Sequence, residues 1–274
     1  MKIRLLIFIL FNVLLSQGEY QVLTTPKNIF QLSTNSGGSI VNHNNDNYTF
    51  SLIQYPVDIK MYNFKIKNYS ISVLDYGIFE DRLYDVLYKT FSAEEILIQY
   101  AYNHDVRHLN FTILTGLYYS HIYNYRALGI NNSVGLNISL KKINSSMGLA
   151  IENIGYMLKH YTAYNISQPL RYRLSFNKNF QSLIFGYNLL YSKNDKNYQH
   201  IVYLEFVMSD RIQLRVSNTN YIRDLFLEDN DYNFLSGLGM GISIDLKPVA
   251  IDIGYMNLGI SGVAYGVSIQ FLHN

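Results

Sequence analysis

Residues 262–271 alternate strictly between large apolar side chains and small or polar ones. One parity holds Val263, Tyr265, Val267, Ile269 and Phe271, and the other holds Gly262, Ala264, Gly266, Ser268 and Gln270. Successive side chains of a β-strand point to opposite faces, so this pattern predicts a strand with one apolar face. About ten residues is also the length with which a tilted strand crosses a lipid bilayer.

The same alternation recurs along the chain from about residue 59 onward. It is clear in residues 134–141, 170–177, 211–217 and 237–246, where charged residues keep to one parity. Less regular strands are predicted at 48–54, 59–66, 69–76, 93–103, 108–121, 146–156, 181–192, 198–207 and 249–257. Together these segments predict about 14 strands in a single domain.

The composition of the small or polar face of these strands distinguishes a soluble β-sandwich from a β-barrel. A soluble sandwich covers its outer face with Lys, Glu and Thr, whereas here that face holds many Gly, Ala, Ser and Asn residues. Small side chains suit a crowded barrel lumen. No segment after the N-terminal region is apolar enough for a transmembrane helix, and a closed barrel is the other way to satisfy the backbone in lipid. We therefore expect a transmembrane antiparallel β-barrel, with a secreted β-sandwich as the alternative.

The N-terminal region has the features of a secretion signal, followed by a segment without apolar–polar alternation. Lys2 and Arg4 precede an apolar run from Leu5 to Leu15, and small residues at Ser16 and Gly18 favour cleavage after residue 18. The apolar run is too short for an uncleaved anchor. We expect residues 1–18 to be a signal peptide, residues 19–47 a luminal plug or periplasmic tail, and residues 48–274 the barrel.

Turn-forming and polar stretches predict the connections between strands. Residues 141–145 and 177–179 resemble tight turns, whereas residues 80–92, 158–169 and 218–233 are longer polar stretches expected to be loops at the opposite end. Short and long connections that alternate in this way are typical of an up-and-down barrel.

Several charged residues fall on the inward parity of the predicted strands. A charge that faces lipid at the bilayer midplane costs about 2–4 kcal/mol, so these residues are expected to face the lumen. They are Arg171, Arg173, Arg211 and Arg215, with Glu205 and Asp245 near them in sequence. One interpretation is a network of ion pairs that only fills the barrel; the sharper one is an anion-selective or ligand-contacting patch.

No catalytic or cofactor motif is present in the sequence, and we expect a protein that is not an enzyme and binds no cofactor or metal. The chain has no Cys, its seven His are scattered, and its net charge of +2 does not favour nucleic acid. Residues 237–241 superficially match a phosphate loop but continue a strand register. His104, Asp105 and His108 are interpreted as a polar turn and not as metal ligands.

Several segments resemble, in order, the PorV/PorQ family of outer-membrane barrels, which are related to the FadL fatty-acid transporters. The most specific match is Met147–Gly155, which fits a Gly-Leu-x-x-x-Asn-x-Gly strand. Val73–Phe79 is similar to a strand that ends in Tyr-Gly-x-Phe, and Gly37-Gly38 to a Gly-Gly element near the mature N-terminus. Gln54 stands where the family has Asn before Pro, which weakens the match at this end.

The resemblance implies a cell outer membrane location, contact with membrane lipid, and a role in type IX secretion or surface attachment of secreted cargo, with secretion components and cargo proteins as partners. The alternative is a FadL-like transporter that passes small hydrophobic molecules through the barrel. Phe271 also fits the terminal aromatic residue of many outer-membrane barrels, although Leu272, His273 and Asn274 follow it.

Overall fold

The computed structural model describes residues 20–35, 48–83, 86–161, 168–194, 196–220 and 235–271. The predicted signal peptide, the Gly37-Gly38 element and the three residues after Phe271 lie outside these ranges. Within the described ranges, no helix is long and apolar enough to cross a membrane.

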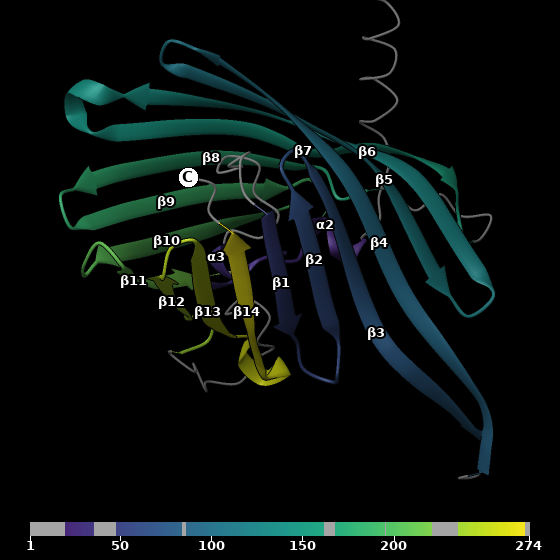
Figure 1. Cartoon of the computed structure of the whole chain (residues 1–274). Helices are drawn as coiled ribbons and strands as arrows, with labels where there is room; N and C mark the ends of the chain where they lie inside the picture. Colours follow the sequence, from purple (N-terminus) through teal and green to yellow (C-terminus); the bar gives the residue numbers. More distant parts are fainter. Residues whose placement is uncertain are drawn as a thin grey trace, which may run out of the picture.

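The described residues form a closed barrel of 14 antiparallel strands (Figure 1). Each strand pairs with its neighbours in sequence, and β14 pairs with β1 to close the wall. The strands are β1 (Tyr48–Gln54), β2 (Lys60–Ile66), β3 (Tyr69–Leu83), β4 (Val86–Val106), β5 (Leu109–Ile122), β6 (Tyr125–Leu140), β7 (Ser145–Lys159), β8 (Arg171–Phe180), β9 (Leu183–Ser192), β10 (Asn197–Val207), β11 (Ile212–Thr219), β12 (Gly239–Asp245), β13 (Val249–Asn257) and β14 (Val263–Phe271). The predicted fold class and strand count are confirmed.

The connections are less well predicted than the strands. The loop expected at residues 80–92 is wrong, because β3 and β4 continue as a paired hairpin through most of it (Figure 1, lower right). Ile78 pairs with Ser92 and Phe79 with Phe91, and the rings of the two phenylalanines stack with centroids 5.2 Å apart. A cross-strand aromatic pair stabilises a hairpin without any regular apolar alternation.

Two short turns were predicted, and one is confirmed. A 3-10 helix, η1 (Lys141–Ile143), followed by Asn144 in the left-handed region, joins β6 to β7. The turn expected at residues 177–179 is wrong: these residues belong to β8, and the chain turns at residues 181–182. Polar composition alone cannot separate a turn from the polar end of a strand.

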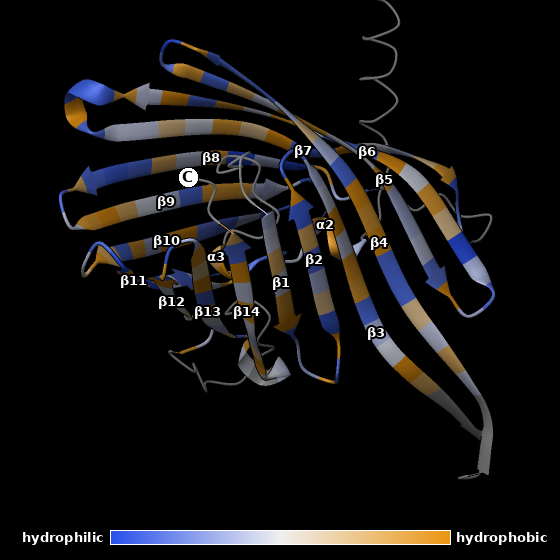
Figure 2. Ribbon diagram, in the orientation of Figure 1, coloured by the Kyte–Doolittle hydropathy of each residue, from blue (hydrophilic) through white to orange (hydrophobic). Residues whose placement is uncertain are grey.

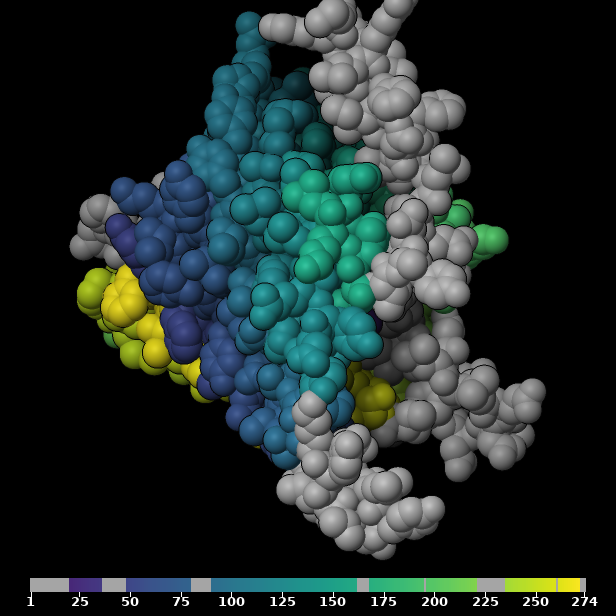
Figure 3. All heavy atoms as spheres, turned by 90° about the vertical axis from the view of Figure 1, so that its right-hand side faces the viewer, coloured from purple at the N-terminus to yellow at the C-terminus, as the bar shows by residue number. Residues whose placement is uncertain are grey.

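The two faces of the wall differ as the alternation predicted. Tyr265, Ile253 and Leu149 are exposed on the outside, whereas Ser51 and Ser268 are fully buried on the inside. The alternation is visible as orange and blue bands along the strands in Figure 2. In the space-filling view of Figure 3, the blue and teal strands form a continuous outer wall. The apolar parity therefore faces outward, where lipid solvates it.

Residues 20–35 lie inside the barrel, and we refer to them as the luminal segment. They contain two short helices, α2 (Gln21–Thr24) and α3 (Ile29–Ser33), and the side chain of Asn28 caps α3 by accepting from Gln31 N at 2.9 Å. The apolar side chains of the segment are buried against inward residues of the wall. The shared cluster includes Tyr20, Val22, Leu23, Ile29, Leu32, Ile53, Met61, Leu74 and Leu97. The main apolar core thus lies between this segment and the wall.

The luminal segment docks beside the strand pair that closes the barrel. Ser268 of β14 donates to Ser51 of β1 at 2.7 Å, and the backbone N–H of Ile29 donates to Ser268 Oγ at 3.2 Å. Gly254 on β13 makes this approach possible, because a Cβ there would lie 2.6 Å from Cγ2 of Ile29. Closure of the wall and docking of α3 therefore use the same seryl hydroxyl.

The outward register predicts a depth-dependent cost of charge on the wall. We expect Ile253→Arg, at the middle of β13, to lower the free energy of unfolding by about 2–4 kcal/mol, and Met147→Arg, near the end of β7, by less than about 1 kcal/mol. Urea unfolding in lipid vesicles measures both values. Equal effects at the two positions would contradict the assigned lipid-facing register.

Candidate functional site

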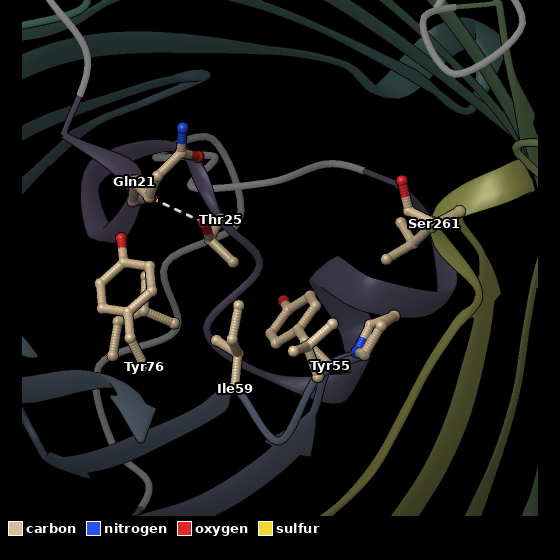
Figure 4. Close-up of a pocket in the computed structure, with 10 residues that line it drawn as sticks. Gln21, Thr25, Tyr55, Ile59, Tyr76 and Ser261 are labelled. Carbon is tan, nitrogen blue, oxygen red and sulfur yellow. Dashed lines mark hydrogen bonds between the residues drawn. The ribbon is translucent and has the colours of Figure 1, made fainter. Parts of the chain in front are cut away.

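A cavity of about 500 Å³ lies between the luminal segment and the wall at one end of the barrel (Figure 4). Its apolar lining consists of Pro56, Val57, Ile59, Leu74 and Leu258. Its polar lining consists of Gln21, Thr25, Tyr55, Tyr76 and Ser261. The volume, and a lining that combines apolar side chains with uncharged polar groups, are typical of small-molecule sites, in which polar groups fix the orientation of the ligand.

Two tight connections at this end form part of the lining. Between β1 and β2, Tyr55 N donates to Ile59 O at 2.8 Å, and Val57 and Asp58 both have φ of 59°. The connection from β13 to β14 contains the 3-10 helix η3 (Gly259–Ser261). Because β1 and β14 are neighbours in the wall, both turns face the same space.

A β-bulge in β3 borders the cavity at Tyr76. The pairing of β3 with β4 shifts register between Asp75 and Ile78, and Gly77 within the bulge has φ of 78°. Gly77 N donates to Asp75 Oδ1 at 2.8 Å. Leu74 and Tyr76 face inward, whereas Ile78, of the same parity, is 76% exposed. The bulge therefore reverses the facing of the strand just beyond the cavity.

Glu95 on β4 joins the cavity wall to the luminal segment. Its side chain is buried; Oε1 accepts from the Tyr76 hydroxyl at 3.2 Å and Oε2 accepts from Val22 N at 2.8 Å. The ring of Tyr20 packs on that of Tyr118, with centroids 4.5 Å apart. This carboxylate therefore fixes both the start of α2 and the orientation of a tyrosine that lines the cavity.

The arginines predicted on β8 lie in the lumen around one buried carboxylate. Arg173 Nε donates to Glu152 Oε1 at 2.9 Å, and Arg173 Nη2 donates to Glu152 Oε2 at 3.2 Å. Arg171 Nη2 lies 3.6 Å from Glu152 Oε2. All three side chains are buried. Glu152 was not among the residues predicted from the sequence, although it shares the inward parity of Gly148 and Ala150 on β7.

A second cluster surrounds Arg215 on β11. Its guanidinium lies 3.3 Å from Glu205 Oε2 and 2.8 Å from Asp252 Oδ1. It also reaches the luminal segment, donating from Nη1 to Ser33 Oγ at 3.4 Å and lying 5.1 Å from the ring centroid of Phe30. This cluster therefore holds α3 as well as the wall.

Arg211 and Asp245 do not join either cluster. Arg211 is exposed in the connection between β10 and β11, and Asp245 is the last residue of β12, where it accepts from Lys247 N at 3.0 Å. The six residues predicted as one patch are thus distributed over two luminal clusters and one rim of the barrel. Neither cluster lines the cavity.

The strand Met147–Gly155, which carried the family resemblance, anchors the connection between β7 and β8. Asn153 has φ of 62° and donates from Nδ2 to Pro169 O at 3.1 Å. A Cβ on Gly155 would overlap the side-chain amide of Gln168, so the glycine makes room for that residue. In this chain the motif has a packing role.

Lys27 is the cation that the luminal segment contributes to the lumen. Its Nζ donates to Gln99 Oε1 at 3.2 Å. Burial and, to a smaller extent, the charge of Arg171 lower the pKa of Lys27 from 10.5 to about 8, while Glu152 opposes the shift. Docking of the segment thus disfavours the protonated ammonium.

Two motif alternatives are settled by the backbone. Of the segment 237–241, residues 239–241 belong to β12, as the strand interpretation predicted, whereas Gly237, with φ of 81°, lies in a turn before the strand. The polar turn expected at residues 104–108 is shorter than predicted: it comprises residues 107–108, and His104 and Asp105 belong to the end of β4, where Asp105 Oδ1 accepts from Asn110 Nδ2 at 2.6 Å. In the described part of the chain, no group of three His, Cys, Asp or Glu residues could hold a metal ion.

No family model matches the chain, and no curated protein matches it in sequence. Solved structures match in fold. The CymD monoaromatic hydrocarbon channel is 9% identical with a TM-score of 0.53, over 93% of this chain and 99% of that one. The toluene transporter TodX of P. putida is 10% identical with a TM-score of 0.49, over 94% and 96%. The KdgM porin is 10% identical with a TM-score of 0.36, over 83% and 99%.

At these identities the likeness shows the fold alone. The closed barrel and its apolar outer surface are those of bacterial outer-membrane proteins and place the chain in an outer membrane. The PorV/PorQ resemblance gains no support from these matches.

The charge cluster on β8 predicts a large effect of neutralising its carboxylate. We expect Glu152→Gln to lower the free energy of unfolding by about 3 kcal/mol, because it removes the anion of a buried ion pair. Asp245→Asn at the rim is the matched control, with an expected change below about 0.5 kcal/mol. Urea unfolding in vesicles measures both, and a change in Glu152→Gln as small as in the control would contradict the assigned pairing.

The lowered pKa of Lys27 predicts that the stability of the barrel depends on pH. The unfolded chain binds its proton up to about pH 10.5 and the folded chain only up to about pH 8, so stability rises with pH between these values and is constant below pH 8 with respect to this group. The urea midpoint should therefore rise from pH 8 to pH 10 in the wild type. Lys27→Met should remove this rise, and an identical rise in the variant would show that another group causes it.

Proposed function

We propose that the barrel passes small, neutral, mainly apolar molecules across the outer membrane by way of the cavity beside the luminal segment. The observation that carries this proposal is the lining of the cavity: five apolar side chains, five uncharged polar ones and, among the described residues, no charged group. A site with that lining disfavours ions and binds apolar surface.

The charged clusters support a structural role in preference to an ion path. In each cluster the guanidinium lies within 4 Å of a carboxylate, and both partners are buried or nearly so. Arg215 also holds Ser33 of the luminal segment. The clusters thus fill the lumen and hold the luminal segment, which we propose to be a plug.

The lengths of the connections orient the barrel. At the end opposite the cavity, six connections contain between two and four residues each. The two longest intervals between strands, from Lys159 to Arg171 and from Thr219 to Gly239, start and finish at the cavity end. Outer-membrane barrels have short periplasmic turns and longer external loops. The cavity therefore opens toward the outside of the cell, where a solute would first meet it.

The comparisons favour transport over secretion. The matched CymD channel is described as a monoaromatic hydrocarbon channel, and a role of that class agrees with the apolar cavity of this chain. The secretion role that the PorV/PorQ resemblance implied gains support from neither the cavity nor the comparisons. The FadL-like alternative is the better interpretation of the barrel.

Filling the cavity should block uptake. We expect Leu74→Trp to lower the uptake of labelled 4-ethylphenol by Gram-negative cells that express the barrel by at least about threefold, because the larger side chain occupies the site. Leu149→Trp, on the outer wall, is the matched control and should leave uptake unchanged. Uptake no faster than in cells without the barrel would contradict the proposed function.

A further inference from the structure

We infer that the cavity selects molecules that carry a hydrogen-bond donor, such as a phenol or an alcohol, over hydrocarbons, ethers and carboxylates of similar size. This inference rests on the proposed function and names the ligand class of the same site. It follows from the direction of the hydrogen bonds that the hydroxyl groups of the lining already make.

The hydroxyl proton of Tyr55 is engaged in a hydrogen bond within the protein. It donates to the backbone carbonyl of Pro26 at 3.2 Å, and a carbonyl oxygen can only accept. A phenolic hydroxyl has one proton, so the Tyr55 oxygen can offer only a lone pair to a ligand in the cavity.

The hydroxyl proton of Tyr76 is also engaged, in this case by a carboxylate. Its hydroxyl donates to Glu95 Oε1 at 3.2 Å, while the other carboxylate oxygen accepts from Val22 N. Glu95 therefore acts as an acceptor at both oxygens. Tyr55 and Tyr76 stand on either side of Ile59 in Figure 4, so two acceptors flank one apolar surface.

Thr25 is the third hydroxyl of the lining whose proton is engaged. Its Oγ1 donates to Gln21 O at 2.6 Å, drawn as the dashed line in Figure 4. The two other polar side chains lie apart from the tyrosines: the amide of Gln21 extends away from them, and Ser261 stands across the cavity. The polar groups nearest to Ile59 thus share one property, which is that they accept.

An acceptor-rich lining discriminates between ligands of equal shape. A ligand O–H can donate to Tyr55 or Tyr76, whereas an ether or ketone meets oxygen lone pairs and leaves its own acceptor unpaired. A carboxylate meets the same lone pairs, and no cation among the described residues lines the cavity. A hydrocarbon gains the apolar contact only.

Calorimetric titration of the full barrel in lipid nanodiscs, with empty nanodiscs as the blank, tests this inference. We expect 4-ethylphenol to bind about fivefold more tightly than 4-ethylanisole, and 4-ethylbenzoate to bind more weakly than both. Tyr76→Phe should reduce 4-ethylphenol affinity about fivefold and leave 4-ethylanisole affinity unchanged. Tyr55→Phe tests the second acceptor independently if Tyr76→Phe does not fold, and Tyr265→Phe on the outer wall is the control.

The outcomes separate the inference from the proposed function. Equal affinities for 4-ethylphenol and 4-ethylanisole, unaffected by either tyrosine variant, would overturn the donor preference and leave transport of apolar molecules standing. Binding of none of the three probes above the blank would overturn both. Loss of 4-ethylphenol affinity in the control variant as well would place binding on the outer wall and would overturn the inference.

Discussion

Lipid supplies no hydrogen bonds to a polypeptide backbone, and the rest of this structure depends on that constraint. The wall must pair every strand on both sides, and the pairing of β14 with β1 completes it. Once the wall is closed, alternate side chains face lipid and lumen, so one parity must be apolar and the other must fit a narrow interior. The serines and glycines of the inner face and the tyrosines, leucines and isoleucines of the outer face follow from this geometry.

A lumen bounded by polar side chains has to be filled or hydrated, and here the luminal segment fills much of it. Several wall residues hold the segment by hydrogen bonds; among them, Glu95 accepts from Val22 N, Ser268 accepts from Ile29 N, and Arg215 donates to Ser33. The apolar side chains of its helices pack on the wall between these points. The cavity is the space that this packing leaves beside two turns and the β3 bulge, so its shape depends on both the segment and the wall.

The sequence was sufficient to predict the barrel and its 14 strands, because lipid imposes a local period of two that can be read residue by residue. It was not sufficient for the outer part of the β3–β4 hairpin, because residues 80–92 lack a regular alternation although most of their backbone is paired. The arginines of β8 and β11 were visible as inward charges, yet their separation into two clusters depends on Glu152 and Asp252, which come from other strands. The cavity could not be predicted from a local sequence pattern, because Tyr55 and Tyr76 contact residues that are distant in sequence and come close only in the closed barrel.

The central claim is that a small apolar molecule binds between the luminal segment and the wall. Intermolecular nuclear Overhauser effects between 4-ethylphenol and the methyl groups of the barrel in nanodiscs measure this directly. The structure predicts cross-peaks to Ile59, Leu74 and Leu258, which line the cavity. Cross-peaks confined to lipid-facing methyl groups such as those of Leu149 and Ile253 would contradict it.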